Sequence, residues 1–154
     1  MKNLKTLYYK ANIEASPLHV HKVMLAKESY KDWTSFFGED SDFRGDWSEG
    51  SKIYFLSKDM NGDEMGMISI IDKNIPGELL TIRSIGIFSK DGELYEGEHV
   101  DGWKNSFEIY RYKVVENGGT DLICSVEVDS EEHEKMFEDI WPKALERLKE
   151  LCEK

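Results

Sequence analysis

Four histidines are the side chains best suited to bind a metal ion or to transfer a proton. His19 and His21 lie two residues apart in a segment that reads as a helix, so they point about 200° apart and cannot chelate one ion together. His99 stands among glutamates and a glycine, and a metal there would need ligands from another part of the chain. His133 falls in the first turn of an expected helix and faces solvent. We therefore expect no metal site and no cofactor.

The cysteines and charged strand residues offer little more chemistry. Cys124 lies on the apolar face of an alternating stretch, where burial raises the pKa of a thiol and makes it inert, and Cys152 lies near the end of the chain. Glu108 and Arg111, with Arg83 on another strand, are expected to form cross-strand ion pairs on the solvent face. The alternative turns one of them inward, where it would anchor the polar head of a ligand. No catalytic residue is assigned, and we favour a protein that is not an enzyme.

Charge and length exclude several classes of protein. The 154 residues carry 20 Lys and Arg against 31 Asp and Glu, a formal net charge of −11. Nucleic-acid binding needs a basic surface, which this composition does not supply, and anionic membranes repel the same charge. No apolar run approaches the roughly 20 residues that cross a bilayer, and the first residues have no signal-peptide core. We expect one cytoplasmic domain over residues 1–154, without nucleic-acid partners or a membrane span.

Alternating apolar residues and turn residues predict seven strands in an antiparallel sheet. Turns such as Asn61-Gly62 and Asn117-Gly118-Gly119 separate consecutive strands as hairpins do. Within the sixth strand, the apolar positions change phase between Ile109 and Tyr110, which predicts a β-bulge or a strong bend there. The expected strands cover residues 4–14, 42–48, 51–58, 63–74, 78–89, 103–116 and 119–129.

The helices follow from caps and from a change of period. Ser16-Pro17 predicts the start of the first of two short helices after the first strand. Apolar residues then recur every three or four positions over residues 130–153, which predicts a long amphipathic helix capped by Asp129 or Ser130. A single sheet must curl to cover that helix. The fold class is therefore α+β, with a curved sheet around a long C-terminal helix.

Several short motifs follow one another along the chain. They are Ile13-x-Ala15-x-Pro17-x-x-Val20, Trp33, Gly45-Asp46-Trp47-x-Glu49-Gly50-Ser51-Lys52-Ile53-x-Phe55, Met65-Gly66-x-Ile68, Pro76-Gly77-Glu78-Leu79-Leu80 and Trp141-x-x-Ala144-Leu145-x-x-Leu148-Lys149-x-Leu151. In this order they resemble the START-related SRPBCC superfamily, and within it the branch named after the C-terminal domain of the activator of the heat-shock chaperone ATPase. The resemblance implies a helix-grip fold of about seven strands, often with an internal cavity for an apolar molecule. Members include lipid carriers, hormone receptors, polyketide cyclases and co-chaperone domains.

Aromatic side chains are the best sequence indication of function, because they are more numerous than a small core needs. Together with the resemblance, they favour a cavity between the sheet and the C-terminal helix that binds a small hydrophobic or amphipathic ligand, a lipid for example. Two alternatives remain open: a co-chaperone-like module that binds a chaperone, and a cyclase or hydrolase that works in the cavity. The expected cavity residues are Trp33, Phe37, Phe55, Met65, Met67, Ser69, Arg83, Trp103, Phe107, Tyr110, Phe137 and Trp141.

Overall fold

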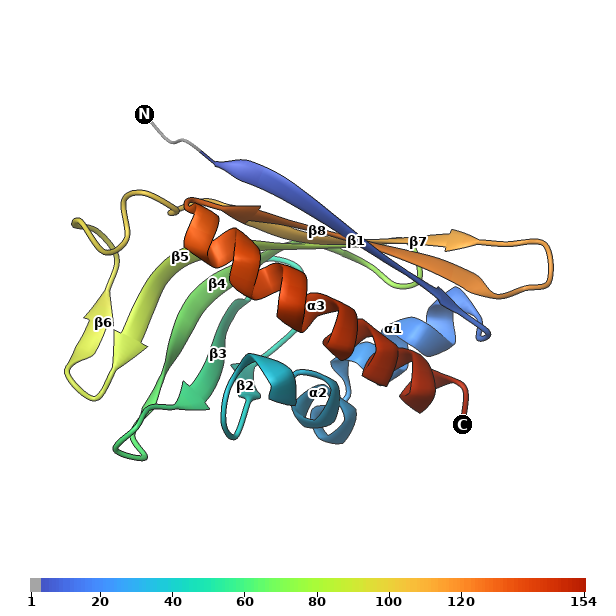
Figure 1. Ribbon diagram of the computed structural model, residues 1–154, viewed down its shortest axis with the longest axis horizontal. Helices are drawn as coiled ribbons and strands as arrows, with labels where there is room; N and C mark the ends of the chain where they lie inside the picture. The colour runs from blue at the N-terminus through green and yellow to red at the C-terminus, as the bar shows by residue number, and fades with distance from the viewer. Residues whose placement is uncertain (1–3) are drawn as a thin grey trace.

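The computed structural model describes residues 4–154, in which a curved antiparallel sheet carries all of the helices on one face (Figure 1). This arrangement confirms the α+β, helix-grip architecture expected from the sequence. The elements in chain order are β1 Lys5–Ile13, α1 Pro17–Leu25, α2 Lys27–Trp33, the 3₁₀ helix η1 Ser35–Phe37, β2 Asp42–Gly45, β3 Lys52–Lys58, β4 Glu64–Ile75, β5 Leu79–Ser89, β6 Gly92–Leu94, β7 Phe107–Val114, β8 Thr120–Val128 and α3 Glu131–Cys152.

The strands of the sheet follow the order β1-β8-β7-β5-β4-β3-β2, and β6 pairs with β5 outside this path. All of the pairings are antiparallel, as hairpin turns require. Figure 1 shows α3 crossing the concave side, with α1 and α2 beside its C-terminal half. The eighth strand, β6, is an addition to the seven that were predicted: it has three exposed residues and therefore no alternation from which it could be recognised.

The caps that mark the helix starts act as the sequence predicts. The Ser16 hydroxyl accepts a hydrogen bond from the backbone N of His19 at 3.3 Å, and Pro17 begins α1. The Ser130 hydroxyl does the same for the backbone N of His133 at 3.1 Å, and α3 then continues through Pro142 to Cys152. These local signals place both helices within one residue of the expected positions.

Strand β7 departs from its prediction. It begins at Phe107 rather than at residue 103, because residues 97–105 form turns, and its register with β5 and β8 runs without a bulge. Glu108, Tyr110 and Tyr112 therefore share one face. The register shifts of the sheet lie instead between β4 and β5. The predicted bulge was wrong because it assumed that the apolar Phe107 and Ile109 lie inside and that Glu108 lies outside.

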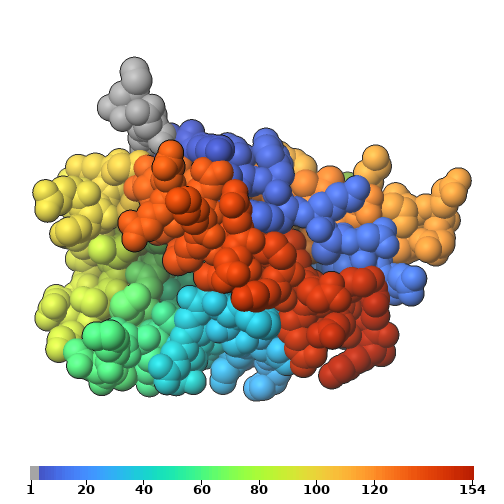
Figure 2. Space-filling model, viewed as in Figure 1, coloured from blue at the N-terminus to red at the C-terminus, as the bar shows by residue number. Residues whose placement is uncertain are grey.

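The two halves of α3 pack differently. Its buried residues begin at Trp141, in the middle of the helix, and the others all fall in the C-terminal half. The space-filling view shows the surface hollowed between the N-terminal half of α3 and the green strands below it (Figure 2). Met65 on β4 is 40% exposed and Met136 on α3 is 44% exposed. No helix within residues 4–154 combines the length and the apolar character needed to cross a membrane.

Candidate functional site

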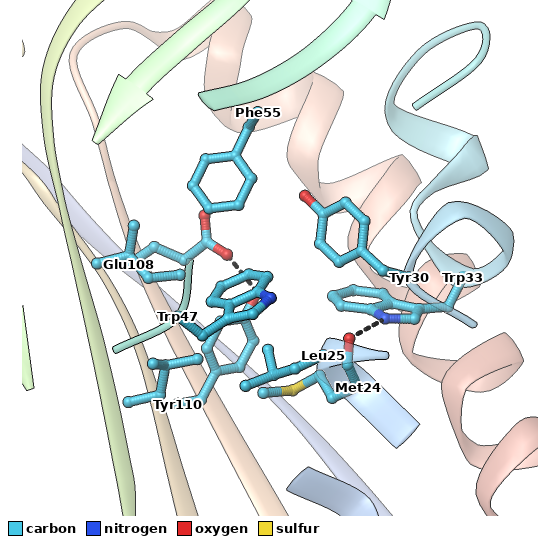
Figure 3. Close-up of a pocket in the computed structure, with 10 residues that line it drawn as sticks. Met24, Leu25, Tyr30, Trp33, Trp47, Phe55, Glu108 and Tyr110 are labelled. Atoms are coloured by element: carbon cyan, nitrogen blue, oxygen red, sulfur yellow. Dashed lines mark hydrogen bonds between the residues drawn. The ribbon is translucent and has the colours of Figure 1, made fainter. Parts of the chain in front are cut away.

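A small internal cavity lies between the sheet and the junction of α1 with α2, and no residue of α3 lines it (Figure 3). Its volume is about 10 Å³, about the room that one water molecule requires. Figure 3 shows aromatic rings and one carboxyl group pointing toward one another around this space. The lining residues are Met24, Leu25, Tyr30, Trp33, Trp47, Phe55, Leu80, Ile82, Glu108 and Tyr110.

Glu108 is the one acidic residue of this lining, and it reaches the cavity because it shares the inward face of β7 with Tyr110. The Tyr110 hydroxyl donates a hydrogen bond to Glu108 Oε2. Burial among apolar side chains raises the pKa of the Glu108 carboxyl, and the bond from Tyr110 opposes this shift only in part. Within residues 4–154, no ion pair compensates the Glu108 charge. The folded chain therefore favours the neutral form of this carboxyl.

The two tyrosines of the lining remain protonated. Burial and the neighbouring Glu108 raise the pKa of Tyr30 well above its ordinary value. The same two causes, in the same order, raise the pKa of Tyr110. Glu108 is thus the group of this lining that can exchange a proton while both tyrosines stay protonated.

Aromatic rings build the wall opposite Glu108. Tyr30 from α2 has its ring centroid 5.9 Å from that of Trp47 and 6.1 Å from that of Phe55. Trp47 and Phe55 lie 5.6 Å apart. Trp33 is held in place because its Nε1 donates to the carbonyl oxygen of Met24 at 3.0 Å. These contacts bring together three segments, residues 24–33, 47 and 55, that are separate in the sequence.

One donor in this wall has no acceptor. The Nε1 atom of Trp47 is buried, and it donates to no atom within the part of the chain that the structure describes. The backbone of the same residue is fixed, because its carbonyl oxygen accepts from Asn74 Nδ2 at 2.8 Å. A buried N–H without an acceptor is destabilising, so this donor is available to a polar atom placed in the cavity.

Of the residues expected to line a cavity, the structure brings Trp33, Phe55 and Tyr110 together around this one. Phe37, Phe137 and Trp141 form a separate aromatic cluster where η1 meets α3. In that cluster, Phe37 lies 5.0 Å from Trp141 and 6.3 Å from Phe137, measured between ring centroids. Trp141 Nε1 is also buried without a described partner.

The expected residues on β4 lie along its inward face but outside the cavity. Ser69 is buried, and its hydroxyl has no hydrogen-bond partner among the described residues. Met67 is half-buried and pairs with Phe55 on β3, whereas Met65 is 40% exposed. None of the three lines the cavity around Glu108.

Arg83, Trp103 and Phe107 do not line the cavity. Arg83 Nε lies 3.2 Å from a carboxylate oxygen of Asp72, and its Nη1 donates to Asn105. Trp103 lies in the turns before β7 and donates to the carbonyl oxygen of His99 at 2.8 Å. Phe107 lies on the opposite face of β7 from Glu108.

Tyr30, Trp47 and Glu108 were not among the cavity residues expected from the sequence. The expectation that Glu108 forms a cross-strand ion pair in solvent was wrong, and the inward alternative describes its position. The alternation of Glu108, Tyr110 and Tyr112 was the available signal. This alternation was missed because Phe107 and Ile109 were assumed to face the core, which places Glu108 on the solvent face.

His21 and Cys124, which were considered for metal binding and nucleophilic chemistry, are buried in the packed interior. His21 is buried, and its Nδ1 lies 2.8 Å from the Tyr112 hydroxyl oxygen, while burial lowers its pKa. Cys124 is buried, and burial raises the pKa of its thiol well above the ordinary value. Within residues 4–154, no three side chains of His, Cys, Asp or Glu are grouped as metal ligands.

Comparison with known proteins identifies the fold. No family model and no curated protein matches the sequence. Solved structures do match: an uncharacterised protein from Rhizobium leguminosarum has a TM-score of 0.71 and 15% identity, covering 98% of this chain and 95% of its own. The Aha1 dimer from Colwellia psychrerythraea has a TM-score of 0.69 and 18% identity, covering 97% and 96%. At these identities, the chain shares with both proteins one fold over nearly its whole length.

Proposed function

We propose that this chain is a member of the START-related SRPBCC superfamily and binds a small, mainly apolar molecule at the cavity around Glu108. The observation that carries the proposal is a carboxyl group turned into an aromatic-lined cavity without an ion-pair partner. Such a group lowers the stability of the folded chain, and proteins keep destabilising groups mainly where function needs them. An apolar wall with a few convergent polar groups is the usual form of a ligand site.

A ligand must widen this cavity, because its present volume is that of a single small polar group. Leu25 and Tyr30 lie on either side of the junction of α1 and α2, where Ala26 has an extended backbone. A small rotation of this junction would separate both side chains from β7. Binding would then be slower than diffusion, because it requires a conformational step.

The indole N–H signals of the four tryptophans provide a direct test. Titration of the ¹⁵N-labelled protein with C4 to C8 apolar compounds is expected to shift the Trp33 and Trp47 signals in a saturable manner. Trp103, in the turns before β7, serves as the internal control. Saturable shifts confined to Trp103, or the absence of any saturable shift, would overturn the proposal.

A matched pair of variants on α1 sharpens this test. Leu25→Trp fills the cavity and is expected to abolish the titration, whereas Leu18→Trp, at a position that is 64% exposed, should leave it unchanged. Circular dichroism shows whether each variant is folded. Equal binding by both variants would place the ligand elsewhere.

Catalysis ranks below binding at this site. The cavity does bring three titratable groups together, which a cyclase or hydrolase would need. However, burial keeps the Tyr30 and Tyr110 hydroxyls protonated, so Glu108 is the one lining group left to exchange a proton. One such group does not make the acid and base pair of these reactions.

A second candidate function is protein interaction, as in co-chaperone domains. It is favoured by the likeness to a protein described as an Aha1 dimer, and by Tyr8, which is 69% exposed on the edge strand β1. Light scattering coupled to gel filtration is expected to give a dimer mass that Tyr8→Lys reduces to a monomer mass. A monomer at all concentrations would remove self-association from consideration.

A further inference from the structure

The polar groups of the cavity specify which chemical group a ligand must carry. Besides the Tyr30 hydroxyl, which makes no hydrogen bond among the described residues, two of them lack a complete set of partners: Trp47 Nε1, which is buried and without an acceptor, and Glu108, whose hydrogen bond from Tyr110 engages one of its two oxygens. Both belong to the lining of the same cavity of about 10 Å³. Both side chains border this space in Figure 3, so a polar atom of a ligand placed between them would meet both groups.

We propose, on the basis of the proposed function, that the site selects an apolar molecule carrying one hydroxyl group, such as an alcohol or a phenol. The hydroxyl oxygen would accept a hydrogen bond from Trp47 Nε1, and the hydroxyl hydrogen would be donated to the free oxygen of Glu108. The hydrocarbon part would displace Leu25 and Tyr30 and contact the aromatic wall of Trp33, Trp47 and Phe55.

Other polar groups satisfy this pair less completely. An ammonium group has donors and no acceptor, so it would leave Trp47 Nε1 without a partner. A ketone accepts from Trp47 but offers no hydrogen to Glu108 when that carboxyl is ionised. A carboxylate is repelled by ionised Glu108 and by the net charge of −11 on the whole chain. A hydroxyl both donates and accepts, so it can pair with Glu108 in either protonation state of that residue.

The hydroxyl preference is tested with ligands of one shape. Cyclohexanol, cyclohexanone, cyclohexylammonium and cyclohexane are titrated separately, with the indole N–H signals of Trp33 and Trp47 as the readout. Cyclohexanol is expected to bind about tenfold more tightly than cyclohexane, the effect of two modest hydrogen bonds. It is also expected to bind more tightly than the ketone and the ammonium ion.

Three variants assign the preference to its residues. Trp47→Phe keeps an aromatic ring and removes the donor, and Glu108→Met keeps the length of the side chain and removes the acceptor. Each is expected to bring the affinity for cyclohexanol close to that for cyclohexane, while cyclohexane still binds. Trp103→Phe removes an indole in the turns before β7 and should leave the ratio at its original value.

The outcomes separate this inference from the proposed function. If cyclohexanol and cyclohexane bind equally well, the cavity is a ligand site but the hydroxyl preference is wrong. Tightest binding by cyclohexylammonium would make the site a cation site and overturn the inference. If none of the four compounds binds, both proposals fail. Loss of the preference in Trp103→Phe as well would show that the preference does not arise at the cavity.

Discussion

The C-terminal half of α3 and the cavity under the α1–α2 junction lie in the same concave side of the sheet, yet they are built differently. Beneath α3, the buried residues from Ala144 to Cys152 are apolar and pack together in the core. Around Glu108, a carboxyl and an indole N–H are buried without full compensation. The packing of the first region stabilises the fold. The incompletely paired polar groups of the second region destabilise it, and they are available to a ligand. This contrast is what the following predictions test.

The largest expected effect is in the packed region. Leu148 on α3 is fully buried, so Leu148→Ala should lower the free energy of unfolding by about 2–5 kcal/mol. Urea denaturation followed by circular dichroism measures the change. Leu18→Ala, at an exposed position on α1, is the control and should remain within about 0.5 kcal/mol of wild type. A loss below about 1 kcal/mol at Leu148 would show that α3 is not packed as described.

The cavity should respond in the opposite direction. Glu108→Gln removes a buried charge and keeps an acceptor for Tyr110, so it should raise the free energy of unfolding at pH 8 by about 0.5–2 kcal/mol. The pKa of Glu108 is raised in the folded state, so wild-type stability from this group is fully present below pH 4.5 and is lost as pH rises through the folded pKa. The increase in the free energy of unfolding caused by Glu108→Gln should therefore be absent at pH 4.

Glu116→Gln, on the exposed turn between β7 and β8, provides the matched control. It should leave stability unchanged at both pH values. Destabilisation by Glu108→Gln at pH 8 would mean that the carboxyl is a structural residue, and the contrast between the two regions would no longer hold.

His21 connects α1 to the sheet between these regions and should make stability sensitive to mild acid. Burial lowers its folded pKa below 6.5, so its neutral form stabilises the fold above pH 6.5, and this stability is lost as pH falls toward the folded pKa. His21→Gln should flatten that slope and cost about 1 kcal/mol at pH 8 through the bond to Tyr112. Equilibrium unfolding between pH 5 and 8 measures both effects. The exposed His99→Gln should keep the wild-type slope.

The smallest effect concerns the link between the two regions. Arg147 on α3 donates from Nε to Asp32 Oδ1 at 2.7 Å and from Nη2 to Asp32 Oδ2 at 2.9 Å, which joins α3 to the helix that carries Tyr30. Both side chains are partly exposed, so a double-mutant cycle with Arg147→Met and Asp32→Asn should give a coupling of about 0.2–1 kcal/mol. No measurable coupling would show that the two regions are mechanically independent.

The fold was accessible from the sequence because its signals are local. Caps at Ser16 and Ser130 and the hairpin turns act within a few residues, and the three-and-four spacing of α3 marks its buried face directly. Only part of the site could be predicted from the sequence. Trp33, Phe55 and Tyr110 were selected as large inward side chains, but Glu108 was expected to face solvent because a charged residue in a strand usually does.

The amino-acid sequence by itself determined the order of the strands and helices and the long apolar face of α3, because hydrogen-bonding periodicity and capping depend on near neighbours. Only the tertiary structure determined where a cavity remains between the packed side chains. The cavity lies under α1 and α2 rather than under α3, since its walls come from residues 24–33, 47, 55, 80–82 and 108–110. Whether side chains from such distant segments fill a space or leave it open depends on their relative positions in three dimensions, which no local pattern records.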